Sequence, residues 1–361
     1  MPAVNSLRGR AALNNPANRF AATHSEWLAE VDAGVSAADA ALPPRSVATE
    51  VRAEQATRII ATNRSPDVPF SQSINPYQGC EHGCIYCFAR PTHAYWDLSP
   101  GLDFETKLSY KANAAELLER ELSRPGYRCK PIALGSNTDP YQPLERERRV
   151  TRQLLEVLQR FNHPFTLTTK SQLVLRDLDI LAPMAARRLC RVQVSVTSLD
   201  SALMRKLEPR TAAPPARLKT IAGLKEAGVP VGVLAAPVIP SINDQELEAI
   251  LGASRAAGAQ TAGYILIRLP HEVKGLFADW LQQHYPGRAR HVMSLIEQCR
   301  GGKAYDSRFG QRMSGSGIVA ELIGKRFAVA CRKLGLQQGE RERLSTELFA
   351  RKGGSTQLAL F

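Results

Sequence analysis

The chain has 361 residues, enough for one large domain with extensions or for two modest domains. Its 44% hydrophobic content allows a full core, and the absence of any apolar run of about 18 residues argues against a membrane span. The first residues carry arginines but no apolar run, so we expect no secretory signal and a cytoplasmic location. A net charge of +13 favours an anionic partner, nucleic acid first, over a basic surface retained only for solubility.

The texture of the sequence divides the chain into four parts. Residues 1–65 are polar, Ala-rich and dotted with arginine, which indicates a partly disordered extension with one helix around Ala22–Val35. Residues 66–290 form the expected core, residues 291–345 a C-terminal helical region, and residues 346–361 a flexible tail.

Within the core, short β-branched runs alternate with amphipathic segments, which predicts βα units on a parallel sheet. The expected strands are Phe70–Ile74, Pro131–Gly135, Phe165–Thr169, Val192–Val196, Val231–Val238 and Gly263–Leu269. The expected helices are Ala114–Leu122, Arg149–Arg160, Leu173–Ala186, Ala216–Ala227 and Gln245–Ala257, then Lys274–Tyr285, Ala289–Cys299 and Ile318–Leu334. Gly228 and Gly258 stand where a left-handed helix cap is wanted. We predict an α/β fold, a partial (β/α)6 TIM-type barrel, with a doubly wound sheet as the alternative.

Three of the seven cysteines fall within eight residues, whereas a disulfide framework would be spaced more evenly. The segment NPYQGCEHGCIYCFAR sets Cys80, Cys84 and Cys87 as C-x3-C-x2-C. Three thiolates on one short loop suit three corners of an iron–sulfur cubane and leave one iron open. Zinc, with His82 or His93 as a further ligand, and a purely structural cluster are the alternatives.

The cysteine motif resembles that of the radical S-adenosylmethionine (SAM) superfamily, in which the amino and carboxylate groups of SAM chelate the open iron. The resemblance implies a [4Fe–4S] cluster and SAM as cofactors, and an electron donor such as flavodoxin or ferredoxin. It also implies reductive cleavage of SAM to a 5′-deoxyadenosyl radical. Tyr86, which precedes the last cysteine, is expected to place its ring against the adenine.

Polar residues follow three of the expected strands, at the end where parallel barrels bind their ligands. Strand two leads into Ser136 and Thr138, strand three ends at Lys170, and strand four ends at Ser195 and Thr197. The hydroxyl groups suit the methionyl amine and the ribose of SAM, and the ammonium group suits its carboxylate. Solvation of the lysine and helix capping by the hydroxyls are the plainer explanations.

The run VQVSVTSLDSALMRKLEPRTAAPPARLKTIAGLKEAGVPVGVLAAPVIP resembles the spore photoproduct lyase branch, the DNA-repair photolyase-like part of that superfamily. The resemblance covers about Ile74 to Pro240, and its shared features are Ser195, Glu208-Pro209, Arg217-Leu218, Ala227-Gly228 and Ala236-Pro237. It implies that Thr138, Lys170, Ser195 and Thr197 bind SAM.

One position departs from that branch. Spore photoproduct lyases carry a hydrogen-donor cysteine at the end of strand two, where this chain has Ser136. A hydroxyl O–H bond is much stronger than a thiol S–H bond, so Ser136 cannot donate the hydrogen atom. Cys129 precedes strand two and is expected at the opposite rim of the barrel. A related but different radical reaction is therefore predicted.

The chain ends in Gln357-Leu358-Ala359-Leu360-Phe361, which resembles the short peptide by which bacterial repair and replication proteins bind the sliding clamp. A glutamine hydrogen bond and two apolar anchors on a flexible terminus would suit such a pocket. Docking of these apolar residues on the protein's own surface is the alternative.

Three classes of function remain open from the sequence. The first is a radical SAM enzyme that acts on DNA or another nucleic acid, and the second is one that modifies a small molecule or a protein. The third is a nucleic-acid-binding protein with a structural cluster. No residue is assigned as the partner of the radical; Tyr77, His93, Tyr95 and Trp96 flank the cysteine loop as candidates for the cavity wall or for packing.

Overall fold

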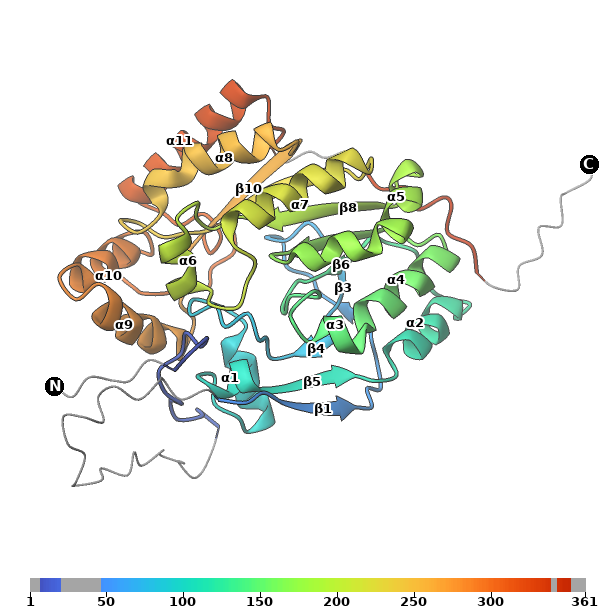
Figure 1. Ribbon diagram of the computed structural model, residues 1–361, viewed down its shortest axis with the longest axis horizontal. Coiled ribbons are helices and arrows are strands. Elements are labelled where there is room, and N and C mark those ends of the chain that lie inside the picture. Colours follow the sequence, from blue (N-terminus) through green and yellow to red (C-terminus); the bar gives the residue numbers. More distant parts are fainter. Residues whose placement is uncertain (1–6, 21–46, 339–342, 352–361) are drawn as a thin grey trace, which may run out of the picture.

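The computed structural model describes residues 7–20, 47–338 and 343–351, and its main feature is a curved parallel sheet (Figure 1). The six parallel strands are β3 (Gln72–Ile74), β6 (Ile132–Leu134), β7 (Phe165–Thr169), β8 (Cys190–Ser195), β9 (Val231–Val238) and β10 (Thr261–Leu266). They lie side by side in chain order, and the short β2 (Ala61–Thr62) pairs antiparallel with β3. Because the order never reverses, as it would in a doubly wound sheet, the partial (β/α)6 barrel is confirmed.

Helices cover the outer face of this sheet in the same order (Figure 1). They are α2 (Ala114–Ser123), α4 (Val150–Arg160), η3 (Gln172–Asp177) with α5 (Leu178–Ala186), α7 (Pro214–Glu226), and η4 (Asp244–Glu246) with α8 (Leu247–Ala256). Shorter helices are η2 (Arg90–Trp96), α1 (Asp103–Thr106), α3 (Glu145–Arg148) and α6 (Ser201–Leu207). The positive φ angles of Gly228 and Gly258 confirm the two predicted left-handed caps.

A second, three-stranded sheet lies beside the barrel and was not predicted. Its central strand β5 (Lys107–Lys111) pairs parallel with β1 (Glu50–Glu54) and antiparallel with β4 (Tyr77–Gln78). Because β4 intervenes between β3 and the cysteines, the cysteine loop leaves this small sheet rather than the barrel strand itself.

The C-terminal region adds α9 (Val273–His284), α10 (Ala289–Gln298) and α11 (Ile318–Leu334). Side chains of α9 and α10 belong to the same buried apolar cluster as Cys84, Ile85 and Tyr86 of the cysteine loop, whereas α11 packs on α8. In the described part of the chain, no helix combines the length and the apolarity needed to cross a bilayer.

Strands β7 and β9 and helix α11 have the predicted bounds, while β10 begins and ends a few residues early and the predicted helix Leu173–Ala186 opens with the 3-10 turn η3. The helix expected around Ala22–Val35 and the tail Gln357–Phe361 lie outside the described residues. The four-part division of the chain stays a prediction.

Candidate cluster and cofactor site

The three clustered cysteines lie on the loop between β4 and η2. Backbone hydrogen bonds shape this loop: the N–H of Cys80 donates to the carbonyl of Phe104 (2.9 Å), and that of Cys87 donates to Cys84 (3.2 Å). Cys80 and Cys84 are buried and Cys87 is half-buried, and all three thiols are free. The loop therefore presents three unpaired thiols from a fixed backbone.

A buried ion pair between Arg90 and Glu105 anchors the cysteine loop. The guanidinium of Arg90 donates to the carbonyl of Cys84 (2.9 Å) and pairs with Glu105 at 2.5 Å. Glu105 also accepts the backbone N–H of Ala12 (3.0 Å). Gly83 has φ +64°, and a Cβ atom there would lie 2.8 Å from Oε2 of Glu105. Only glycine fits this turn against the buried carboxylate.

The thiols fit a cluster better than a single metal ion. Burial raises the pKa of Cys84 and of Cys87, and the nearby Lys170 ammonium opposes that rise for both. In the described ranges, no three His, Cys, Asp or Glu side chains converge on the position of one metal ion. A cubane instead takes its thiolate ligands on separate iron atoms, so it does not require the three thiols to converge on one point.

Of the two histidines considered as zinc ligands, His82 contacts both Cys80 and Asp139, whereas His93 contacts a backbone carbonyl. Nε2 of His93 lies 2.9 Å from the carbonyl oxygen of Lys107. His82 is buried, and its Nδ1 lies 3.4 Å from Oδ2 of Asp139. Neither ring completes a four-ligand set with the cysteines, as a structural zinc site would require.

Asp139 ties the cysteine loop to the neighbouring strand end. Its carboxylate accepts the hydroxyl of Thr169 (2.7 Å) and the backbone N–H of Lys170 (2.7 Å), and it faces His82. Burial alone would raise the pKa of Asp139, but the facing imidazole outweighs it and lowers that pKa to about 2. The ammonium of Lys170 donates to the hydroxyl of Ser195 (2.9 Å), which links the ends of β7 and β8.

Glu208 contacts side chains that lie just after strands β7 and β8. Its buried carboxylate accepts the hydroxyl of Thr197 (2.7 Å), pairs with the buried guanidinium of Arg217, and lies 3.9 Å from Nζ of Lys170. Arg217 also donates to the carbonyl of Ser195 (3.0 Å). Glu208 and Arg217 stood out in the sequence only through the family resemblance, although a buried charged pair is rare without a purpose.

The predicted SAM-binding residues therefore fall into two groups. Tyr86, Lys170, Ser195 and Thr197 form one set, since the hydroxyl oxygen of Tyr86 lies 3.4 Å from that of Thr197. The other two positions contact the chain that follows β3. Thr138 donates its hydroxyl to the carbonyl of Tyr77 (3.0 Å). Ser136 pairs with the side chain of Asn75 (3.2 Å). For all six, SAM binding stays a prediction.

An arginine–aromatic cluster that the sequence did not suggest lies next to the cysteines. Phe88 follows Cys87 directly and is 41% exposed, and the guanidinium of Arg268, just beyond β10, lies 4.3 Å from its ring centroid. Phe309 is 62% exposed, with the guanidinium of Arg312 5.1 Å from its ring. We call these four residues the mouth cluster. Such residues are scattered in sequence, so only the fold brings them together.

The segment that carries Phe309 and Arg312 is fastened on both sides of the barrel opening. On one side, the N–H of Leu266 in β10 donates to the carbonyl of Met313 (2.9 Å). On the other, Arg312 pairs with Asp67, in the loop before β3, at 2.5 Å. The open edge between the first and last barrel strands is thereby bridged.

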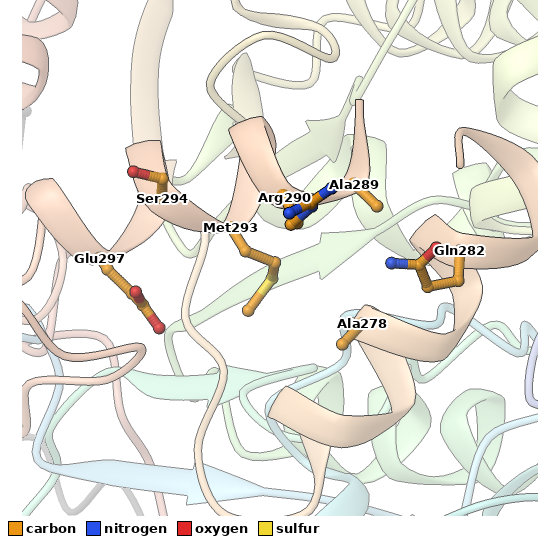
Figure 2. Close-up of a pocket in the computed structure, with 7 residues that line it drawn as sticks. All are labelled: Ala278, Gln282, Ala289, Arg290, Met293, Ser294 and Glu297. Atoms are coloured by element: carbon orange, nitrogen blue, oxygen red, sulfur yellow. The ribbon is translucent and has the colours of Figure 1, made fainter. Parts of the chain in front are cut away.

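The described cavities lie away from the cysteines. Figure 2 shows a hollow of about 300 Å³ between α9 and α10, lined by Ala278, Gln282, Ala289, Arg290, Met293, Ser294 and Glu297. A second hollow, of about 470 Å³, includes Val192, Val231 and Thr261 and so opens near the strand beginnings. No predicted site residue lines either cavity, so both are separate from the site.

Comparison with known proteins agrees with the cysteine motif and the barrel. Residues 74–253 match the model of the Radical SAM superfamily. An uncharacterized protein of Mycobacterium bovis is 38% identical over 231 residues, which are 63% of this chain and 68% of that protein. The chain belongs to the radical SAM superfamily. An uncharacterized protein of Methanocaldococcus jannaschii is 25% identical over 213 residues, 59% of this chain and 76% of that protein.

Among solved structures, spore photoproduct lyase resembles this radical SAM protein in fold. The complex with dinucleoside spore photoproduct gives a TM-score of 0.56 at 15% identity and covers 79% of this chain and 80% of that one. Membership of the superfamily makes the protein an enzyme whose cofactors are a [4Fe–4S] cluster and SAM. The alternative of a binding protein with a merely structural cluster is set aside, and the substrate is left open.

Proposed function

We propose that this radical SAM enzyme holds its cluster through Cys80, Cys84 and Cys87 and acts on nucleic acid. The observation that carries the substrate class is the mouth cluster, two exposed aromatic rings that each lie near a guanidinium, one of them, Phe88, directly after the last cysteine of the loop. Aromatic rings stack on unpaired bases, and arginines neutralise phosphates. A surface that combines both therefore suits a nucleic acid, with a base against the rings and its phosphate backbone near the guanidinium groups.

The cofactors supply one kind of chemistry when bound: one electron cleaves the C5′–S bond of SAM, which releases methionine and a 5′-deoxyadenosyl radical able to abstract a substrate hydrogen atom. The residues of the chain bind and orient. Lys170, steadied by Ser195, offers an ammonium to the SAM carboxylate. Tyr86 offers a ring for the adenine and Thr197 a hydroxyl for the ribose or carboxylate. Glu208 and Asp139 hold these groups in place.

Electrostatics support a polyanionic substrate. Burial lowers the pKa of the Arg268 guanidinium and the neighbouring Arg312 lowers it further, although Tyr305 and Asp67 oppose this, so an anion bound beside Arg268 would offset the repulsion between the two guanidinium groups. The whole chain carries a net charge of +13, which attracts phosphate backbones over longer distances. Spore photoproduct lyase, similar in fold, has been solved with a dinucleoside lesion, which lends the proposal an analogy.

The reaction on that substrate is proposed to differ from spore photoproduct repair. Ser136 stands where that branch has its donor cysteine, and its hydroxyl pairs with Asn75. Cys129 lies before β6, at the other end of the barrel. The substrate radical would therefore be quenched, or transformed, without a thiol at this position.

The test combines product analysis with binding. Holoenzyme with dithionite and SAM is offered single-stranded DNA, single-stranded RNA and duplex, and 5′-deoxyadenosine and altered nucleotides are measured. We expect a nucleic acid to raise 5′-deoxyadenosine formation and to bind with a steep salt dependence. Phe88→Ala and Arg268→Gln should each weaken binding about tenfold.

The matched control is Leu348→Ala, a partly exposed apolar residue of the C-terminal segment, which should bind as wild type does. If no nucleic acid changes 5′-deoxyadenosine formation and binding is weak and independent of salt, the proposal fails. Stimulation by a small molecule or a protein instead would establish the competing class.

We also propose a partner for the C-terminal peptide Gln357–Phe361, namely a bacterial sliding clamp. The last described residues dock at the strand beginnings: the N–H of Ala350 donates to Phe161, and Arg351 donates to the carbonyl of Tyr127. In sequence, Gln357–Phe361 follow this anchored segment. Absence of binding between the full chain and a bacterial sliding clamp would refute this proposal.

A further inference from the structure

A second group of exposed aromatic side chains lies on the segment that follows the cysteine loop. Tyr95 and Trp96, at the end of η2, are 71% and 51% exposed, and Phe20, whose ring lies beside that of Tyr95, is 58% exposed. The rings of Phe20 and Tyr95 have centroids 5.2 Å apart, and the guanidinium of Arg19 lies over both. We call Phe20, Tyr95, Trp96 and Arg19 the aromatic patch. Large aromatic rings are normally buried, so a group of three exposed rings indicates an interaction surface.

The patch is held in place rather than hanging from a loose loop. The side-chain amide of Asn18 donates to the carbonyl of Ala94 (3.2 Å) and to Asp97 (3.2 Å), which fastens the N-terminal segment to η2. Arg19 pairs with Glu272 of the loop before α9 at 3.0 Å. The rings are therefore positioned before any ligand arrives, which lowers the entropy cost of binding.

The patch is also connected to the mouth cluster through a short rigid element. One residue, Ala89, separates Phe88 from η2, which spans seven residues from Arg90 to Trp96. At about 2 Å per residue, the ends of this 3-10 helix are about 12 Å apart. Arg90, at the near end, is anchored to the carbonyl of Cys84. A single strand of a few nucleotides is long enough to span this separation.

We infer that the aromatic patch is a second nucleic-acid contact, which binds a single strand extending from the base held at the mouth. The inference rests on the proposed nucleic-acid function and specifies its substrate as single-stranded. Exposed rings beside a guanidinium stack on unpaired bases of any sequence, whereas duplex bases are already stacked on each other. The positive net charge of the chain complements the phosphates of that strand.

The test measures binding by the holoenzyme under anaerobic conditions. Fluorescence anisotropy is followed with labelled single strands of about 12 nucleotides and with a duplex of the same length. Tyr95→Ala combined with Trp96→Ala should weaken single-strand affinity about tenfold to a hundredfold and affect duplex affinity much less. The ring-preserving pair Tyr95→Phe and Trp96→Tyr should restore affinity to within a few-fold of wild type.

The matched control is Leu322→Ala on α11, a side chain about as exposed as Trp96, which should leave affinity unchanged. Wild-type single-strand affinity in the Tyr95/Trp96 alanine variant, while Phe88→Ala still weakens binding, would overturn this inference and leave the proposed function standing. An equal loss for single strand and duplex would also overturn it. A change in oligomeric state of the alanine variant, with unchanged affinity, would assign the patch to self-association instead.

Discussion

The two ends of the barrel are built from different interactions. At the end that carries the cysteines, ionised groups are buried in pairs, Arg90 with Glu105 and Arg217 with Glu208. At the opposite end, the C-terminal segment closes the strand beginnings with neutral rings. There Phe349 packs within 5.4–6.4 Å, centroid to centroid, of three rings, those of Tyr127, Phe161 and His163.

This difference indicates that the buried ion pairs serve the candidate site, whereas the neutral rings serve the stability of the fold. A buried ion pair contributes little net stability, because its desolvation offsets most of its attraction. Such pairs persist where they orient ligands, and perturbed charges gather at functional sites. Neutral rings at the other end bury apolar area without that cost. This contrast supports our proposal that the chemistry of this enzyme takes place at the carboxyl ends of the strands, as in other parallel barrels.

The strongest way to test this division is to remove one cysteine at a time. Cys80→Ala, Cys84→Ala and Cys87→Ala should each lose most of the iron and the electron paramagnetic resonance signal of the reduced cluster, because no other thiolate is available at the loop. Reductive SAM cleavage should fall to background. Cys129→Ala, at the other end of the barrel, should keep the iron, the signal and the cleavage. Full iron content in any loop variant would remove that cysteine from the ligand set.

The sequence was most informative where one signal acted locally. Strand β9 and helix α11 were bounded correctly because their apolar patterns are long and are punctuated by glycine or proline. The sheet of β1, β5 and β4 escaped prediction, since β1 and β5 are short, mostly polar and more than 50 residues apart, and only their pairing makes them strands.

The candidate site was likewise predictable only where the signal lay within one short stretch of sequence. Lys170, Ser195 and Thr197 were proposed from their place at strand ends, and the structure joins them. Asp139 was not singled out from the sequence, because its role depends on a histidine 57 positions earlier, at His82. Phe88 and Arg268 are 180 positions apart and meet only through the closure of the barrel.

A second test compares a buried ion pair of the mouth with an exposed one elsewhere. Glu208→Gln keeps the shape of the side chain but leaves the Arg217 guanidinium buried without a counter-charge, so we expect unfolding free energy to fall by about 3–5 kcal/mol. Affinity for SAM should fall too, because Thr197 and Lys170 lose their common partner. Glu248→Gln, which breaks the more exposed pair with Arg326, should cost less than about 1 kcal/mol.

Urea unfolding and SAM binding, measured on the two variants side by side, decide the matter. Equal losses of stability in the two variants would show that the mouth pair is effectively hydrated, and the contrast between the two ends would lose its energetic basis.

The smallest predicted effect is a pH dependence of stability that arises from His163, among the neutral rings at the strand beginnings. Burial lowers the pKa of His163 from 6.5 to about 4, so its native form stays neutral where the unfolded chain takes up a proton. Stability is therefore complete above pH 6.5 and declines as the pH falls toward 4, by at most about 3 kcal/mol. His163→Gln should unfold with a shallower pH dependence over that window, whereas the exposed His291→Gln should follow the wild type. Parallel curves for wild type and His163→Gln would mean that water reaches this ring, and that the C-terminal segment does not seal the barrel.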